Sequence, residues 1–202
     1  MPKSIFVYPG IIGPIIYTIV LFTLGVLEPG YNPILQSMSE LGDIDAPYAI
    51  IMNTLGFPLL GIFFMLFAIG VQQNISSGVG TKIGPLLIAI SGLFLILTGI
   101  FPCDPDCIDV TVTGGLHSFF ATLAAILMIP VPLAIVPRVY SDQGWHRYIW
   151  LCWIVVIISG FFSMLYMFPE FAAYTGLLQR LAMAPPLVWM VITAIKILGV
   201  VE

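Results

Sequence analysis

Long apolar runs separated by short polar segments make up most of the chain. The runs cover approximately residues 5–27, 48–72, 83–102, 115–137, 148–168 and 182–200. A helix needs about 20 apolar residues to cross the hydrocarbon core of a bilayer. The strands of a membrane barrel would alternate apolar and polar positions, whereas these runs are apolar on all sides. The pattern therefore predicts an all-α protein: one membrane-embedded domain, residues 1–202, built as a bundle of six transmembrane helices.

The polar stretch PGYNPILQSMSELGD, residues 29–43, lies between the first two runs. Asn32 followed by Pro33 is typical of a helix start, and Gly42 is typical of a helix end. We therefore expect a short amphipathic helix in this first loop, lying on the membrane interface or dipping into it. Such a helix either covers a ligand site or simply seals the end of the bundle, and we weigh the two equally.

Composition agrees with a membrane protein and excludes some partners. The chain is 60% hydrophobic and 8% charged, whereas soluble domains have about 25% charged residues. The net charge of −4 and the lack of a Lys/Arg cluster argue against a nucleic-acid partner. Membrane lipid is the expected partner. No charged residue lies near the centre of a run, which argues against an ion-coupled pump or a proton relay.

The distribution of charge predicts the orientation. Six spans place both termini on one side, and that side carries five of the six basic residues: Lys3, Lys82, Arg138, Arg147 and Lys196. Only Arg180 lies on the other side. All acids except Asp142 and Glu202 also lie there. Because loops rich in Lys and Arg stay in the cytoplasm, we expect a cell-membrane protein with both termini cytoplasmic and an acidic outer face.

Two cysteines lie in the second outer loop, within the stretch FPCDPDC. Cys103 and Cys107 face a compartment in which disulfides persist, so they are a candidate structural disulfide. Cys152 falls inside the fifth span, so a second thiol pair for redox catalysis is missing. Three cysteines on two sides cannot converge on zinc, and the two histidines also fall on opposite sides. We therefore expect no metal site and no cofactor.

The remaining polar residues of the outer face are candidates for binding. His117 with Glu40 and Asp104 could hold a metal or act as acid and base, although a lone interfacial histidine is more often structural. Arg180 is expected to pair with Glu40 or Asp104 and tie the loops together, or to bind an anionic headgroup. With the first loop included, the candidate binding residues are Asn32, Ser39, Glu40, Asp104, His117 and Arg180.

The same residues carry a family resemblance. The stretch PGYNPILQSMSELG, the FPCD exit of the third span, the histidine after TGG and the stretch GLLQR resemble domain-of-unknown-function family 998. The resemblance covers almost the whole chain and implies a six-span membrane protein, but no reaction. The family pattern maps onto Asn32, Pro33, Ser39, Glu40, Asp104, His117 and Arg180.

Three functions are compatible with these features. The first is binding of a lipid headgroup or small polar ligand in a pocket of the outer face. The second, ranked nearly level, is an accessory or structural subunit of a larger membrane complex, in contact with other membrane proteins. The third is an enzyme of the outer leaflet that uses Glu40, Asp104 and His117.

Overall fold

The computed structural model describes residues 5–75, 82–140 and 143–199. Within these residues there is no strand, and six segments are long and apolar enough to cross a membrane. The segments are Ile5–Leu27, Ala49–Asn74, Ile83–Ile100, Val112–Val139, His146–Tyr166 and Pro169–Leu198. The predicted all-α bundle of six membrane-spanning segments is therefore confirmed.

Each span is built from one main helix with short additions. The main helices are α1 (Pro9–Leu27), α3 (Phe57–Asn74), α4 (Ile83–Ile100), α5 (Val112–Met128), α7 (His146–Tyr166) and α8 (Thr175–Leu198). The additions include α2 (Ala49–Ile51) before α3, α6 (Val131–Val139) after α5, and a 3-10 helix, Pro169–Tyr174, before α8. The last span begins well before the predicted residue 182. The reason is that Arg180 satisfies its charge on nearby carbonyl groups and so fits within the helix.

Prolines account for the irregular parts of two spans. Pro58 has no N–H to donate to the preceding turn, and a π-helical turn, Met52–Gly56, lies just before it. Pro130 separates α5 from α6 within the fourth span. Pro14 lies inside α1 without interrupting that helix, and the Thr18 hydroxyl donates to the carbonyl oxygen of Pro14 at 2.7 Å. The breaks thus lie where the backbone loses a donor.

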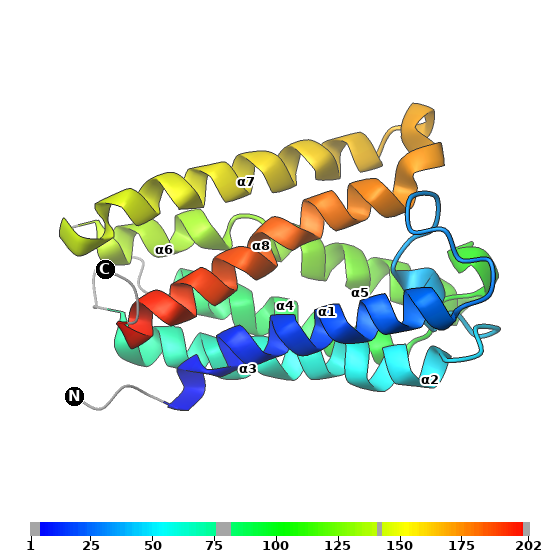
Figure 1. Cartoon of the computed structure of the whole chain (residues 1–202), viewed down its shortest axis with the longest axis horizontal. Coiled ribbons are helices and arrows are strands. Elements are labelled where there is room, and N and C mark those ends of the chain that lie inside the picture. Colours follow the sequence, from blue (N-terminus) through cyan, green and yellow to red (C-terminus); the bar gives the residue numbers. More distant parts are fainter. Residues whose placement is uncertain (1–4, 76–81, 141–142, 200–202) are drawn as a thin grey trace.

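The helices form a closed ring in which chain neighbours pack together. The α3 helix packs on α1 and α4, α4 also contacts α5 and α6, α6 contacts α7, and α8 lies between α7 and α1 (Figure 1). Helices α3 and α4 approach each other closely at Gly61 and Gly92. A Cβ atom on either glycine would collide with the carbonyl oxygen of the other. Small residues at such crossings allow membrane helices to pack backbone to backbone.

The two ends of the bundle differ in charge. Helix α1 begins, and α8 ends, at one end (Figure 1). Among the described residues this end holds Lys82, Arg138, Arg147 and Lys196, and we call it the basic end. The opposite end, here the acidic end, is formed by residues 28–48, 101–111 and 167–174 with the first turns of α8. Lys3, Asp142 and Glu202 lie outside the described residues. Which end faces the cytoplasm stays a prediction.

Candidate functional site

The first loop of the acidic end folds through a ladder of side-chain hydrogen bonds. The backbone N–H of Asn32 donates to Gln36 Oε1 at 2.8 Å, and Gln36 Nε2 donates to Glu40 Oε2 at 2.9 Å. Glu40 Oε1 also accepts from the N–H of Ser37 at 2.7 Å. Glu40 is therefore fixed in place by two donors from its own loop.

The expected amphipathic helix is much shorter than the sequence indicated. Only Ser39–Gly42 is helical, as a 3-10 helix that ends at the predicted Gly42. Asn32 does not cap a helix. Its Oδ1 accepts from the N–H of Ile34 at 3.0 Å, which closes a turn around Pro33. The chain then leaves the helical path because the N–H of Met38 donates to Gln179 Oε1 on α8 at 2.6 Å. A partner distant in sequence thus replaces the local helical bonds.

Arg180 ties the first loop to α8, but not through an acid as predicted. Its Nη1 donates to the carbonyl oxygens of Pro33 at 2.8 Å, Gln36 at 3.1 Å and Gly176 at 2.9 Å. Its Nη2 donates to the hydroxyl oxygen of Tyr31, whose ring lies 5.6 Å from the guanidinium carbon. No ion pair joins Arg180 to Glu40 or Asp104 within the described ranges. The planar fork of arginine suits such a set of acceptors.

Asp104 organises the second loop. Its Oδ2 accepts from the N–H groups of Val110 at 2.8 Å and Thr111 at 2.6 Å, and its Oδ1 accepts from the Thr111 hydroxyl at 2.7 Å. These hydrogen bonds, led by those from Thr111, lower the pKa of the Asp104 carboxyl below its usual value. Thr111 in turn caps α5 by accepting from the N–H of Gly114 at 3.1 Å. Asp104 is 2% exposed, so its role here is structural.

Cys103 and Cys107 form the disulfide that the sequence predicted. Cys103 is buried and Cys107 half-buried, and the carbonyl oxygen of Cys103 accepts from the N–H of Ile44 at 3.1 Å. The disulfide loop is thereby joined to the end of the first loop. Cys152 is a buried thiol in α7, as expected from its position in the fifth span.

His117 lies beneath the disulfide in α5 and is 1% exposed. Its Nδ1 lies 3.0 Å from the carbonyl oxygen of Thr98 and 2.9 Å from that of Phe101. A carbonyl oxygen only accepts, so Nδ1 carries the proton and donates to both. Its Nε2 is buried and has no hydrogen-bond partner among the described residues. An orphaned buried acceptor of this kind typically costs about 1–3 kcal/mol.

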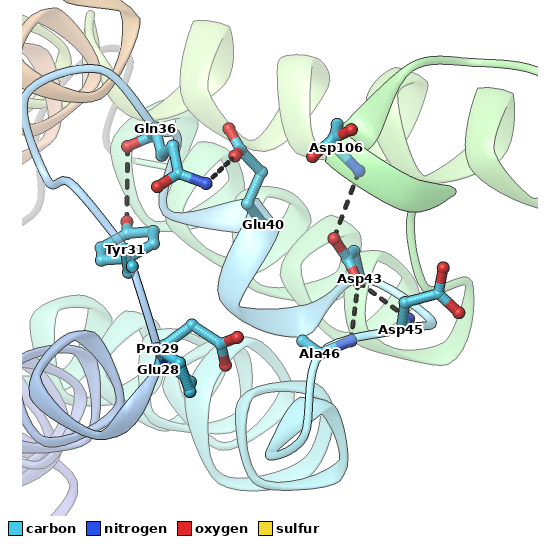
Figure 2. Close-up of a pocket in the computed structure, with 10 residues that line it drawn as sticks. Glu28, Pro29, Tyr31, Gln36, Glu40, Asp43, Asp45, Ala46 and Asp106 are labelled. Atoms are coloured by element: carbon cyan, nitrogen blue, oxygen red, sulfur yellow. Dashed lines mark hydrogen bonds between the residues drawn. The ribbon is translucent and has the colours of Figure 1, made fainter.

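A hollow of about 210 Å³ opens between the first and second loops. No basic side chain of the described residues lines it. Its lining contains five carboxylates, those of Glu28, Glu40, Asp43, Asp45 and Asp106. Figure 2 shows Glu28, at the end of α1, facing the 3-10 helix that carries Glu40. Tyr31 and Gln36 complete one wall. The lining is therefore acidic and polar.

The carboxylates of the hollow differ in how they are held. Asp43 Oδ1 accepts from the N–H groups of Asp45 and Ala46, both at 2.8 Å, and its Oδ2 accepts from the N–H of Asp106 at 3.3 Å. The carboxylate of Glu28, by contrast, accepts no hydrogen bond among the described residues. Burial raises the pKa of the Glu28 carboxyl, and the charge of Asp43 raises it further. The hollow thus combines carboxylates fixed by hydrogen bonds, Glu40 and Asp43, with carboxylates that accept none among the described residues.

The predicted binding residues do not share one site. Only Glu40 lines the hollow. His117 lies with the cysteines, Asp104 folds its own loop, Arg180 and Asn32 fix the first loop, and Ser39 is buried beside Cys103. Sequence reasoning placed Glu28, Asp43, Asp45 and Asp106 on the acidic face but did not select them. Their clustering depends on the backbone path of two loops, which no spacing in the sequence reveals.

Comparison with protein-family models gave one match, to a family described as "Protein of unknown function (DUF998)", over residues 11–196. The chain belongs to the DUF998 family. The matched region includes the three loop segments of the acidic end and most or all of each of the six spans, since it begins within α1 and ends within α8. Comparisons with curated proteins and with solved structures gave no match. Membership therefore agrees with a multi-pass membrane protein and assigns no activity.

Proposed function

We propose that this DUF998 protein binds a small organic cation, a ligand with an ammonium group, in the hollow of the acidic end. The observation that carries the proposal is the lining: five carboxylates around about 210 Å³ with no basic side chain of the described residues among them. Organic-ligand pockets typically measure about 300–1,000 Å³, so this hollow suits a group smaller than a drug. It is also much larger than a bare metal ion.

Electrostatics supports a cation rather than a neutral or anionic ligand. Carboxylates gathered at one place repel one another, and the pKa of Glu28 is raised first by burial and then by the charge of Asp43. A cation beside Glu28 would reverse the effect of Asp43 and favour the ionised carboxylate. Among the described residues, Arg180 forms no ion pair with these carboxylates, and its donors are used on backbone carbonyls and Tyr31.

The ammonium group can come from a free amine or from an aminolipid headgroup. By the charge argument from the sequence, the acidic end faces outward, where either source would reach it. Ethanolamine represents the shared chemistry, and ethylene glycol is a neutral analogue of similar size.

The test is a titration of the protein in nanodiscs of phosphatidylglycerol alone. We expect saturable binding of ethanolamine and none of ethylene glycol. Glu28→Gln and Asp45→Asn should each weaken binding about two- to fivefold, the effect of one partly exposed charge pair. Glu170→Gln is the matched control, because Glu170 is an exposed acid at the same end but outside the hollow.

A second arm separates the two sources. If a lipid headgroup is the ligand, phosphatidylethanolamine in the nanodisc should compete with ethanolamine and weaken its apparent affinity. If the ligand is free, lipid composition should have no effect. Equal binding of ethanolamine and ethylene glycol, or equal loss with all three variants, would contradict the proposal.

The geometry favours this function over an enzyme that uses Glu40, Asp104 and His117. The Asp104 carboxylate is saturated by its own loop, and His117 directs its proton toward two carbonyl oxygens. Glu40 faces the hollow, whereas the other two lie outside its lining. A role as a subunit of a membrane complex stays a prediction. The exposed apolar side chains of α7, among them Trp150 and Phe161, suit lipid as well as a partner protein.

A further inference from the structure

Cys103, Cys107 and His117 form a compact group of metal-ligand atoms at the acidic end. One atom from each, the two sulfurs and a ring nitrogen, all lie within 4.8 Å of one another. The sequence argument against zinc considered three cysteines and found that they lie on two sides. It missed that two cysteines and a histidine converge, because His117 reaches the second loop only through the folding of α5 beneath it.

The histidine is oriented as metal-bound histidines usually are. Its Nδ1–H donates to the carbonyl oxygens of Thr98 and Phe101. Metal ligands of this type almost always donate their second ring N–H to a carbonyl or carboxylate, which fixes the tautomer and the ring direction. Nε2 is then left with a free lone pair, and in this structure it is buried without a partner among the described residues. The ring of Phe57, 5.9 Å away, packs against the imidazole at its side.

We propose that reduction of the Cys103–Cys107 disulfide creates a Zn²⁺ site formed by the two thiolates and His117 Nε2. Two cysteines and one histidine leave the fourth position of a tetrahedral zinc ion open for water or a ligand. In the oxidised protein the two sulfurs are bonded to each other and cannot bind the ion. The disulfide thus acts as a redox gate on the metal site.

Reduction of the Cys103–Cys107 disulfide requires two electrons and two protons. A dithiol reductant supplies two electrons and two protons through thiol–disulfide exchange. The S–S bond breaks, Cys103 and Cys107 become thiols, and the reductant becomes a cyclic disulfide. Zn²⁺ then replaces the two thiol protons, which are released to solvent because zinc is bound by thiolates.

The change requires one of the two sulfurs to move. Zinc–sulfur bonds of about 2.3 Å in a tetrahedron require the sulfurs to separate to roughly 3.8 Å. Cys103 is buried and anchored to Ile44, whereas Cys107 is half-buried between the exposed residues Asp106 and Ile108. Asp106 and Cys107 both have positive φ angles, 55° and 50°, a region that non-glycine residues rarely occupy. Cys107 is thus the ligand that moves.

The primary test measures zinc bound to the full-length protein in detergent. The protein is reduced by a dithiol without oxygen, exposed to Zn²⁺, freed of excess metal and analysed by mass spectrometry for zinc. We expect one equivalent in the reduced protein and none above background in the oxidised protein. Zinc held by the carboxylates of the hollow would appear in both states, so this test is independent of the proposed cation site.

Matched variants identify the ligands. His117→Gln should weaken zinc binding at least about 100-fold. Substitution of a residue that only hydrogen-bonds to a metal ligand typically costs about 10- to 100-fold, and loss of a ligand itself should cost at least as much. His146→Gln and Cys152→Ser should bind as the unsubstituted protein does, because His146 lies at the basic end and Cys152 is buried in α7. Equal affinity of His117→Gln and His146→Gln, or equal zinc content in the two redox states, would overturn the proposal.

A second readout keeps the test valid if His117→Gln does not fold. In the reduced, unsubstituted protein, Zn²⁺ should slow alkylation of Cys107 at least about tenfold. Co²⁺ in place of Zn²⁺ should give a thiolate-to-metal charge-transfer absorption. Unchanged alkylation, no such absorption, or a disulfide that cannot be reduced in the folded protein would each overturn the proposal.

Discussion

Arg138 at the basic end and Arg180 at the acidic end both donate to backbone carbonyl oxygens, but their neighbours differ in charge. At the basic end, Arg138 is 2% exposed and donates to Gln72 Oε1 at 2.9 Å and to the carbonyl oxygens of Gln72 at 3.3 Å and Ile75 at 2.5 Å. At the acidic end, Arg180 donates to carbonyl oxygens of the first loop. Arg138 thereby closes the C-terminal end of α3, where a cation is favoured. Arg180 closes a loop that lies next to five carboxylates.

The comparison shows how the charges of the acidic end are divided. Its one arginine is used on the backbone, although carboxylates lie nearby. The acids are therefore left without a basic partner from the described part of the chain, and they face the hollow. At the basic end, Arg138 is buried, and the donors described above all reach the end of α3. The difference indicates that the carboxylates of the acidic end are available to bind a ligand, whereas Arg138 stabilises the fold.

Removing Arg138 should give the largest effect. Arg138→Met leaves the carbonyl groups at the end of α3 buried and unpaired, which should destabilise the protein by about 3 kcal/mol. For a chain of this size that corresponds to a fall of roughly 6–12 °C in the unfolding temperature in detergent. Lys82→Met, at an exposed residue of the same end, should change stability by about 0.5 kcal/mol or less. Similar effects of the two substitutions would show that Arg138 is not a structural centre.

Arg180→Lys should loosen the first loop without unfolding the bundle. A lysine ammonium keeps the charge but cannot reproduce the fork that reaches Pro33, Gln36 and Tyr31 together. We expect a loss of about 1–2 kcal/mol, confined to this loop. Hydrogen exchange should show faster exchange of the N–H groups of residues 35–40 and unchanged exchange in α3. Unaltered exchange in the loop would contradict the role given to Arg180.

The sequence predicts the structure of the spans better than the structure of the loops. The six spans follow from run length, because hydrocarbon thickness fixes how many apolar residues are needed. The disulfide follows from spacing, and Gly42 ends a helix as expected. The bond from Met38 to Gln179 does not follow, since its two partners are far apart in the sequence and meet only after α8 docks. The ladder Asn32–Gln36–Glu40 joins residues four apart, but it lies in a loop where the sequence predicted a helix. The hollow therefore required the structure.

Acidification should destabilise the second loop, which is held by the Asp104 carboxylate. The pKa of Asp104 is lowered by its hydrogen bonds, so the ionised carboxylate stabilises the loop. This contribution is fully present above the pKa of an unfolded aspartate, about 3.9, and is lost as pH falls through the lower pKa of the folded state. We expect Asp104→Asn to destabilise the second loop at neutral pH, because the ionised carboxylate accepts the hydrogen bonds from Val110 and Thr111. Hydrogen exchange of the Thr111 N–H, corrected for intrinsic exchange, measures this effect. Its protection should fall on acidification in the unsubstituted protein and should not change with pH for this reason in Asp104→Asn.

The smallest effect, and the most direct test of the central claim, is proton release on binding of ethanolamine. Because the pKa of Glu28 is raised, a cation in the hollow should lower it and displace a fraction of a proton. Affinity should rise with pH through that pKa and then level. Calorimetry in two buffers of different ionisation enthalpy measures this proton directly. We predict release near the raised pKa, no release well above that pKa, and none in Glu28→Gln. Binding of ethanolamine without proton release near that pKa, or the same release from Glu28→Gln, would contradict the account.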